Sequence, residues 1–328
     1  MKVLVTGGGG FLGSAIVRLL IQDGYQVRSL ARNRYPELTK LGVDQIQGDL
    51  SSFETVRLAA MGCDSIIHTA AKAGIGGGLS DYWRVNVSGT ENVLEACRSN
   101  GISRLVHTSS PSVVFNGRDM DGVDESATYP SHFEAHYPRT KAEAEKRVLA
   151  ANGPKLATVA LRPHLIWGPG DNHLVPRILD RGRRGKLRRI GKRNPVIDST
   201  YIDNAAEAHL IALKRLNPGS AVAGKVYFIS NGEPIPTWEL VNAILAAGNL
   251  PPVSKHVPVW LATGIGWLME ITYRLFRSES EPPMTRFLAK ELSTSHWFDL
   301  SAARRDLDYI PRVSNSEGLN RLKGYLNR

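Results

Sequence analysis

One tyrosine–lysine pair stands out among the residues of this sequence that could do chemistry. Tyr137 is followed four residues later by Lys141, and no other tyrosine of the chain has a lysine at that spacing. The spacing places both side chains on one face of a helix. An ammonium group beside a phenol stabilises the phenolate and lowers the phenol pKa from its usual value of about 10. Such a tyrosine can donate a proton to a ketone near neutral pH, so the pair predicts acid–base chemistry at a carbonyl group.

A glycine-rich segment near the N-terminus predicts a second element of a site. Residues 6–13 read Thr-Gly-Gly-Gly-Gly-Phe-Leu-Gly, between an apolar strand pattern at 2–6 and a helical pattern at 11–22. The glycines permit a tight turn and a close approach of the backbone to a pyrophosphate, which then rests on the N-terminus of the helix. We therefore predict a dinucleotide site with contacts from Gly7, Gly10, Phe11, Leu12 and Gly13.

The end of the second predicted strand, at 26–30, indicates which dinucleotide binds. A carboxylate there would hydrogen-bond the 2′-hydroxyl of the adenosine ribose and repel a 2′-phosphate. Residues 27–34 contain no acid, and Arg32 is well placed for a phosphate. We therefore expect NADP(H), with NAD(H) as the alternative. Asp49 and Leu50 follow the third strand, at 44–47, where Asp49 would accept a hydrogen bond from the adenine or else cap the next turn.

Serines at the end of the predicted strand 104–108 supply a third element. The carboxyl end of such a strand faces the cofactor crevice, where a hydroxyl can bind the substrate oxygen. We choose Ser110 for this role; Ser109 is the alternative and otherwise contacts the cofactor. Asn86 lies within a predicted helix, where asparagine is disfavoured, which suggests a buried polar role such as a water relay to Lys141. The remaining predicted cofactor contacts flank the crevice: Ala70, Ala71, Lys72 and Pro163.

The elements that must position these residues alternate between strand and helix through the first half of the chain. Such alternation implies right-handed crossovers and a parallel sheet covered on both faces. Regularity weakens after Gly168, where prolines and glycines cluster. We predict an α/β fold: a Rossmann-type doubly wound parallel sheet with a smaller mixed C-terminal substrate domain. Residues 1–168 and 198–230 would form the NADP-binding domain, and residues 169–197 and 231–328 the substrate-binding part.

Composition narrows the class of protein. The chain has 328 residues, 42% of them hydrophobic, which is ample for a buried core. Its two cysteines argue against a disulfide framework or a multi-cysteine metal site. The histidines His68, His107 and His164 lack paired ligand spacing, so we interpret them as core or pocket residues and expect no metal. No export signal is visible and no apolar run reaches the ~20 residues that span a bilayer, so we expect a soluble cytoplasmic protein.

The charge is unevenly distributed. The net charge is +10, and residues 181–193 hold eight cations and no acid. A solvated loop or an anionic partner surface explains such a run. No aromatic pattern or nucleic-acid motif accompanies it, so we expect no nucleic-acid partner.

Taken together, these motifs resemble an extended short-chain dehydrogenase/reductase over nearly the whole chain. In that family a serine, a tyrosine and a lysine are catalytic and the lysine also binds the nicotinamide ribose, which the resemblance assigns here to Ser110, Tyr137 and Lys141. The motifs that carry the resemblance are the glycine-rich turn, Asp49-Leu50, Thr69-Ala70-Ala71, Asn86, Thr108-Ser109-Ser110, Tyr137 with Lys141, and Leu161-Arg162-Pro163.

Residues 162–171 and 200–204 resemble the 3β-hydroxysteroid dehydrogenase-like branch. Residues 35–38, 149–152, 228–234 and 285–289 indicate a closer resemblance to the bacterial 2-alkyl-3-oxoalkanoate reductases of long-chain olefin biosynthesis. The resemblance implies NADPH-dependent reduction of a long-chain β-keto acid, with other enzymes of the olefin pathway as partners. The alternatives are an NAD-dependent 3β-hydroxysteroid or sterol dehydrogenase and a nucleotide-sugar epimerase or dehydratase. Dehydratases need an acidic pair beside the strand-end hydroxyl, whereas Ser110 is followed by Pro111-Ser112.

An apolar segment, Pro258 to Met269, continues with Tyr273, Leu275 and Phe276. It predicts a helix whose apolar face closes a substrate tunnel, touches a membrane or partner, or lies in the core. We expect the C-terminal part to hold the alkyl tails, at most peripheral contact with a membrane, and a homodimer.

Overall fold

A seven-stranded parallel sheet forms the centre of the molecule, which a computed structural model describes at residues 1–74, 76–276 and 282–328. The strand order is β12-β7-β5-β4-β1-β2-β3, and the order reverses between β1 and β4. Ligand crevices in open α/β sheets form at such a reversal, outside the carboxyl ends of the strands. The strands are β1 (Lys2–Thr6), β2 (Gln26–Ala31), β3 (Asp44–Gln47), β4 (Ser65–His68), β5 (Arg104–Thr108), β7 (Ala157–Pro163) and β12 (Val226–Ile229).

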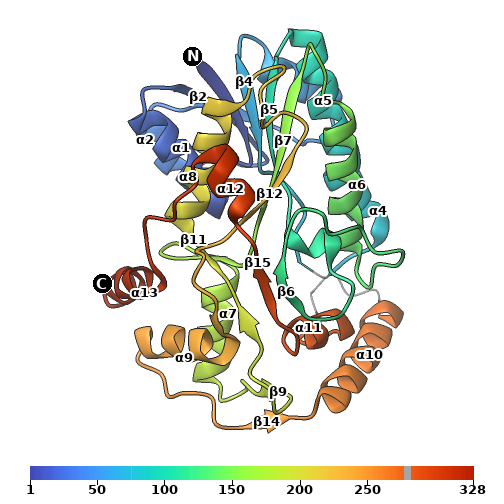
Figure 1. The fold of residues 1–328 in the computed structure, drawn as a ribbon, viewed down its shortest axis with the longest axis vertical. Coiled ribbons are helices and arrows are strands. Elements are labelled where there is room, and N and C mark those ends of the chain that lie inside the picture. The colour runs from blue at the N-terminus through green and yellow to red at the C-terminus, as the bar shows by residue number, and fades with distance from the viewer. Residues whose placement is uncertain (75, 277–281) are drawn as a thin grey trace.

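Helices cover both faces of this sheet, as predicted (Figure 1). Helices α1 (Phe11–Gln22) and α8 (Ile202–Arg215) pack together on one face. Helices α3 (Phe53–Ala60), α5 (Gly89–Asn100) and α6 (His136–Ala150) cover the other. Because both faces are covered, β4 and β7 are buried along their whole length and not only at alternate residues. The Rossmann-type sheet is therefore confirmed.

Two features of the helices affect the site. Helix α6 begins at His136, so Tyr137 and Pro138 lie in its first turn. Proline is tolerated there because the first amide groups of a helix have no intrahelical partner. Between α4 (Leu79–Tyr82) and α5 the chain forms a π-helical turn, η1 (Trp83–Ser88). A π-helical turn is rare and is frequent at functional sites.

Smaller elements gather beyond the carboxyl ends of the main sheet (Figure 1). A four-stranded mixed sheet has the order β13-β10-β15-β6. The sequence did not predict β6 (Met120–Val123), which pairs with β15 (His296–Phe298) from near the end of the chain. The other strands are β13 (Ile235–Pro236), β10 (Val196–Ile197), and the pairs β8 (Ile166–Trp167) with β11 (Thr200–Tyr201) and β9 (Arg189–Ile190) with β14 (His256–Val257).

The helices of this part are short, apart from one. They include α7 (Leu174–Arg183), α9 (Thr237–Ala247) and α11 (Arg286–Glu291), and the long helix is α10 (Val259–Leu275), at the lower right of Figure 1. Helices α12 (Ser301–Leu307) and α13 (Asn315–Leu326) return toward β12 and α9. A smaller mixed C-terminal part is thus present, while the division into two domains stays a prediction. None of the helices described is long and apolar enough to cross a membrane.

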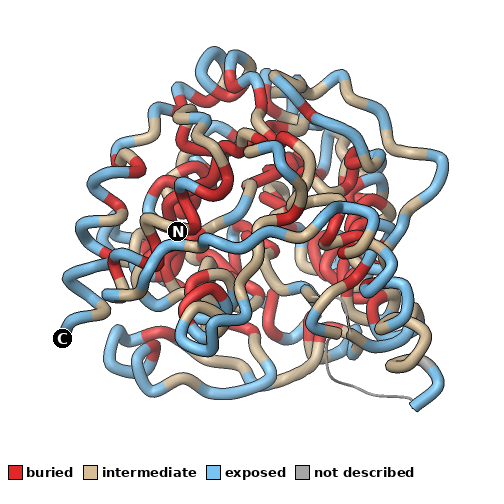
Figure 2. The backbone as a smooth tube through the Cα atoms, turned by 90° about the horizontal axis from the view of Figure 1, so that it is seen from below, coloured by how far each residue is buried: buried red, intermediate tan, exposed pale blue. Residues whose placement is uncertain are grey.

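Buried residues form the interior between the sheet and its helices, and the outer turns are exposed (Figure 2). One apolar cluster lies between the sheet and the pair α3 and α5. The larger cluster runs from the opposite face of the sheet into the C-terminal part. The two parts of the molecule therefore share a continuous core.

Candidate active site

A cleft of about 760 Å³ opens at the carboxyl ends of the central strands. It is lined by every residue predicted to bind the cofactor, and by Ser110, Tyr137 and Lys141. These residues come from segments far apart in the sequence, and the strand order brings them together. Asn86 is the one predicted site residue that does not line the cleft.

The glycine-rich turn fits a pyrophosphate. Gly7 has a positive φ of 73°, and a Cβ atom on it would lie 3.0 Å from the backbone of Ala70. A Cβ atom on Gly13 would overlap the carbonyl oxygen of Gly7. Helix α1 begins after Gly10 without a side-chain cap. Its first amide groups are therefore available to an anion, whose charge the helix dipole favours.

Two arginines, Arg32 and Arg84, lie on the wall of the cleft near the carboxyl ends of β2 and β3. Arg32 follows β2 directly and is exposed on the wall of the cleft. The carboxylate of Asp49 accepts a hydrogen bond from the backbone of Ser51 at 2.8 Å and lies 3.7 Å from the guanidinium of Arg84. The hydrogen bonds from Ser51, and then the charges of Arg84 and Arg32, lower the pKa of Asp49. Sequence reasoning missed Arg84, because an arginine within a helical pattern resembles any solvated surface residue.

Tyr137 and Ser110 contact each other at the centre of the cleft. Burial raises the pKa of Tyr137 to about 12, although a hydrogen bond from Ser110 opposes the rise; the charge of Glu291 adds to it. This differs from the predicted lowering by Lys141. The charge of Lys141 is not among the causes that act on the pKa of Tyr137, and the Lys141 Nζ donates a hydrogen bond to the carbonyl oxygen of Thr108.

The backbone of strand β5 holds Lys141. Its Nζ donates a hydrogen bond to the carbonyl oxygen of Thr108 at 2.6 Å and lies 3.4 Å from Nε2 of His107. Burial lowers the pKa of Lys141 to about 8, and the charge of Glu145, one helical turn away, opposes this. The amine therefore titrates close to neutral pH, where catalytic groups are commonly tuned.

The two serines after β5 have different environments. The Oγ of Ser110 lies 2.9 Å from the Oγ of Ser112 and accepts a hydrogen bond from its backbone, so Ser110 caps the turn Pro111–Val114 as well as contacting Tyr137. The hydroxyl of Ser109 is buried and has no hydrogen-bond partner within the described protein. A buried polar group without a partner is costly, and this one lines the cleft, where a ligand would satisfy it.

Asn86 lies behind the cleft, in η1. Its Oδ1 accepts a hydrogen bond from the backbone of Lys72 at 2.7 Å, and its Nδ2 donates to the Lys72 carbonyl and to Oγ1 of Thr140. Asn86 thus ties the loop after β4 to helix α6, beside Lys141. A water relay through it stays a prediction.

A buried ion pair joins helix α6, which carries Tyr137 and Lys141, to strand β7. Glu145 and Arg162 make two hydrogen bonds, of 2.6 and 3.0 Å, and both side chains are almost completely buried. The Tyr129 hydroxyl donates a further hydrogen bond to Glu145 at 2.7 Å. This network joins α6 to β7. Sequence reasoning missed it, although the spacing from Lys141 to Glu145 is the same as that from Tyr137 to Lys141.

The three histidines singled out in the sequence lie in the interior. His68 makes hydrogen bonds with Thr6 at 2.7 Å and Thr90 at 3.0 Å, and burial lowers its pKa to about 3. The His107 ring lies 5.3 Å from that of His68. His164 contacts the backbone of Asp198 and stacks against His296. They are core and pocket residues, as interpreted from the sequence.

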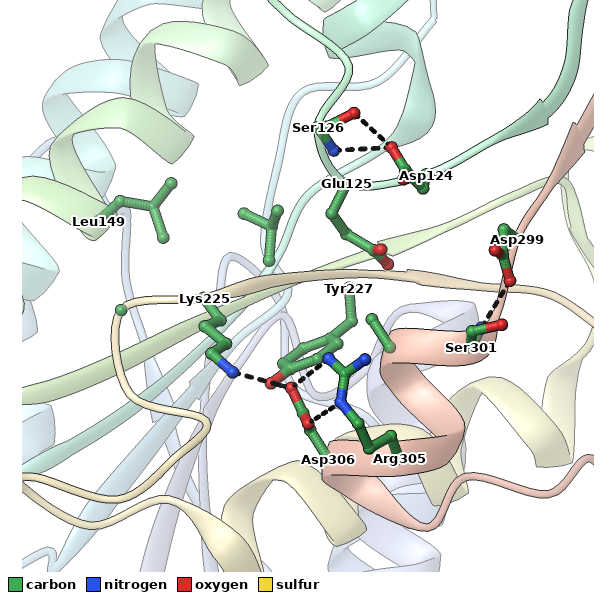
Figure 3. A pocket seen from close by; sticks show the side chains of 13 residues that line it. Asp124, Glu125, Ser126, Leu149, Lys225, Tyr227, Asp299, Ser301, Arg305 and Asp306 are labelled. Atoms are coloured by element: carbon green, nitrogen blue, oxygen red, sulfur yellow. Dashed lines mark hydrogen bonds and ion pairs between the residues drawn. The ribbon is translucent and has the colours of Figure 1, made fainter.

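A second hollow, of about 550 Å³, lies beside β12 and α12, separate from the cleft that holds Tyr137 and Lys141. Figure 3 shows the side chains that line it. Its charged side chains are all engaged in hydrogen bonds or ion pairs within the protein. Asp306 accepts hydrogen bonds from Lys225, Tyr227 and Arg305, and Asp299 caps the start of α12 at Ser301. The hollow is therefore a structural ion-pair network that fastens α12 to the edge of the sheet.

Comparison with known proteins identifies the family. Residues 4–257 match the model of the 3-beta hydroxysteroid dehydrogenase/isomerase family. The chain belongs to this family. A 2-alkyl-3-oxoalkanoate reductase of Stenotrophomonas maltophilia strain K279a is 52% identical over 325 residues, with 98% of each chain covered. A protein of the same name from Shewanella oneidensis is 50% identical, with 98% of this chain and 85% of the relative covered. A mouse sterol-4-alpha-carboxylate 3-dehydrogenase is 32% identical, with 98% and 89% covered.

Solved structures with the same fold include nucleotide-sugar enzymes. The UDP-glucose 4-epimerase of Thermus thermophilus, in complex with NAD, is 25% identical with a TM-score of 0.75. The UDP-glucuronic acid 4-epimerase of Bacillus cereus is 22% identical with a TM-score of 0.76. Both alignments cover 100% of this chain and 99% of the other. The family and the fold make this chain a nicotinamide-dinucleotide oxidoreductase that acts on CH–OH groups. The fold alone does not distinguish substrates.

Proposed function

We propose that the protein uses NADPH to reduce the 3-keto group of a long-chain 2-alkyl-3-oxoalkanoate, giving the 2-alkyl-3-hydroxyalkanoate, in bacterial long-chain olefin biosynthesis. The supporting observation is the 52% identity to a 2-alkyl-3-oxoalkanoate reductase along almost the whole of both chains. It is joined by the presence of Ser110, Tyr137 and Lys141 in one cleft.

The mechanism follows from the contacts of the three side chains. The bound cofactor supplies the hydride that reduces the keto carbon. The hydroxyl groups of Ser110 and Tyr137 hold the keto oxygen, and the Tyr137 phenol gives its proton to that oxygen as negative charge develops on it. A pKa near 12 keeps Tyr137 protonated at neutral pH, yet an alkoxide is still basic enough to take the proton. Lys141 would hydrogen-bond the nicotinamide ribose of the bound cofactor.

The preference for NADPH rests on the end of β2. Arg32 is exposed on the cleft wall, and no acid occurs among residues 27–34. Arg84, on the same wall, adds positive charge close to Asp49. A guanidinium group suits a 2′-phosphate, which a carboxylate at this position would repel. NAD(H) is the alternative cofactor.

The alkyl tails need an apolar surface beyond the catalytic residues. Leu165 and Ile166 line the cleft next to Pro163, on the segment that leads into the C-terminal part. Leu165 has a positive φ of 39° and is partly exposed, so the backbone presents an apolar side chain to the cleft at some conformational cost. We place the tails along this wall.

The cellular setting is part of the same proposal. Both cysteines, Cys63 and Cys97, are buried free thiols, which suits a reducing compartment such as the cytoplasm. The β-hydroxy acid product would pass to enzymes that activate and lactonise it. We propose that the protein works as a homodimer.

A substrate panel tests the proposal. NADPH oxidation is followed with 2-alkyl-3-oxo acids of increasing chain length, a 3-ketosteroid and UDP-sugars, and the product is identified by mass. We expect one hydroxy acid formed per NADPH consumed, and a kcat/KM that rises with tail length because each buried methylene contributes about 0.8 kcal/mol. A flat chain-length profile, or a preference for the steroid or a UDP-sugar, would contradict the substrate assignment. The Tyr137→Phe variant serves as the inactive control.

A further inference from the structure

We propose that the outer face of helix α10, together with the basic segment 181–193, docks the protein on an anionic lipid surface. We call these two elements the docking face. Neither contributes to the cleft that holds Tyr137 and Lys141. The argument rests on how α10 is attached, on what it exposes, and on the charge beside it.

Helix α10 is attached to the protein through its smallest residues. Ala262 is buried on its inner face, and so is Gly266 one turn later. A Cβ atom on Gly266 would lie 2.6 Å from the carbonyl carbon of Thr285, so the backbone of α10 sits directly against the start of α11. Glu270 reinforces this attachment by binding the backbone and guanidinium of Arg286. The helix is therefore held in one orientation, and its large side chains face outward.

Those outward side chains are apolar. Trp260, Trp267, Leu268 and Leu275 are 74%, 52%, 59% and 74% exposed. At 100° per residue they fall within an arc of about 100° on the side opposite Ala262 and Gly266. Monomeric proteins rarely expose a continuous apolar stripe of this kind without using it. A helix too short to span a bilayer, with tryptophans on its apolar face, is typical of one that lies in the plane of a membrane interface.

The basic segment lies next to the first turn of α10. Strand β9 within it pairs with β14, which leads directly into α10. A Cβ atom on Gly191 would lie 3.0 Å from Cγ2 of Val259. Figure 1 shows β9, β14 and α10 at the same end of the molecule. The basic segment therefore lies beside the first turn of the helix that carries the apolar stripe.

Much of that charge is uncompensated. Arg184 pairs with Asp180 and Arg193 with Asp119. Within the described chain, the exposed side chains of Arg183, Lys186 and Lys192 have no carboxylate at ion-pair distance. Each cation held near an anionic bilayer strengthens binding.

The combination favours lipid over a second copy of the chain. A symmetric contact through the docking face would bring two segments with eight cations each close together, which is repulsive. An anionic bilayer offers opposite charge and an apolar layer at the same surface. The purpose of docking rests on the proposed function: a substrate with two long alkyl chains partitions into a bilayer, and docking would bring the enzyme to it.

Vesicle binding tests the docking face without any substrate, so its outcome is separate from that of the proposed function. The full-length protein is sedimented with vesicles of phosphatidylcholine alone and of phosphatidylcholine with phosphatidylglycerol. We expect binding to the anionic vesicles, weakened by high salt. Trp260→Ser with Trp267→Ser should weaken it about tenfold or more. A matched control removes exposed apolar side chains elsewhere, Leu58→Ser with Ile310→Ser, and should bind as the wild type does.

Charge-reversal variants test the contribution of the basic segment in the same vesicle sedimentation assay. Arg183→Glu with Lys186→Glu should abolish the preference for anionic vesicles, whereas Lys155→Glu with Lys323→Glu makes the same change in net charge at exposed positions elsewhere and should leave most of the binding. Absence of binding to anionic vesicles, or equal losses in the test and control variants, would overturn the proposal. So would a wild-type dimer in solution that the double tryptophan variant dissociates, because the face would then join two copies.

A labelling experiment keeps the proposal testable should a serine variant fold poorly. Trp260→Cys is labelled with an environment-sensitive fluorophore; the two natural cysteines are buried and should not react. A blue shift on addition of anionic vesicles, absent for a label at Leu58→Cys, supports docking. Equal spectra at the two positions contradict it. Reduction of a water-soluble short-chain keto acid should be the same for all these variants.

Discussion

The ammonium nitrogen of Lys141 lies 2.6 Å from the backbone carbonyl oxygen of Thr108, at the carboxyl end of β5. A charged side chain on α6 is thereby fixed to strand β5, in the interior. Burial disfavours its charge and lowers the pKa of Lys141 to about 8. Burying the ammonium of Lys141 therefore lowers the free energy of unfolding.

Replacing Lys141 by methionine should stabilise the protein while abolishing reduction. At pH 7 the unfolded chain carries this lysine fully charged in water, whereas the folded protein must bury the charge. The stabilising effect of Lys141→Met should be about 1–3 kcal/mol at pH 7. It should shrink as the pH rises through 8 toward 10.5, because the folded protein then loses the buried proton. Urea unfolding at pH 7 and pH 9.5 measures both values.

The matched control for this effect is Lys155→Met, since Lys155 is exposed. It should change the free energy of unfolding by no more than about 0.5 kcal/mol at either pH. A destabilised Lys141→Met protein at pH 7 would mean that the hydrogen bond to Thr108 outweighs the cost of burial.

Tyr137→Phe should remove the proton donor and little else. The ring still packs against its neighbours, but no proton reaches the developing alkoxide, so kcat should fall by about 10²–10⁴-fold. The dissociation constant of NADPH, measured by fluorescence titration, should stay within about threefold. The control is Tyr325→Phe at an exposed position of α13. Wild-type turnover in Tyr137→Phe, with chemistry rate-limiting, would identify another acid.

Arg32→Ala should weaken the binding of NADPH but not that of NADH. A charge-assisted contact with the 2′-phosphate is worth roughly 1.5–3 kcal/mol, so NADPH affinity should fall by about one to two decades while NADH affinity hardly changes. Arg34→Ala is the matched control, because Arg34 is exposed and does not line the cleft. Calorimetric titration of both cofactors gives the ratio. Equal affinities for NADH and NADPH in the wild type would exclude the 2′-phosphate contact.

The protein should lose stability steeply below pH 6.5. Burial lowers the pKa of His68 and His164 to about 3 and of His209 and His296 to about 4. As the pH falls below 6.5, these histidines become protonated in the unfolded chain but stay neutral in the folded protein. Each of them therefore lowers the free energy of unfolding by up to about 2 kcal/mol at pH 5. Glu291, with its pKa raised to about 7 by burial, acts in the opposite direction but is a single group.

Urea unfolding between pH 7.5 and pH 5 measures this loss. His132→Asn with His256→Asn, both at exposed positions, should leave the pH dependence unchanged. A free energy of unfolding that stays constant down to pH 5 would show that the buried rings are protonated in the folded protein.

Sequence patterns predicted the parallel sheet and about half of the residues that line the cleft. This was possible because local geometry dictates them. The turn at residues 7–13 needs glycine at Gly7 and Gly13 whatever surrounds it, and a four-residue spacing on a helix brings Tyr137 and Lys141 to one face. Strand ends in a parallel sheet meet at a common edge, which places Ser110 there too.

Tertiary structure decided what those side chains contact. The Lys141 ammonium hydrogen-bonds the Thr108 carbonyl, while burial, together with the charge of Glu291 from near the end of the chain, raises the pKa of Tyr137 instead of lowering it. The apolar pattern of α10 was likewise visible in the sequence, but not which face it would bury. That was decided by the close packing of Gly266 on the backbone of Thr285, which turns the tryptophans outward. Periodicity describes the local backbone, whereas charge environment and burial depend on segments that only the fold brings together.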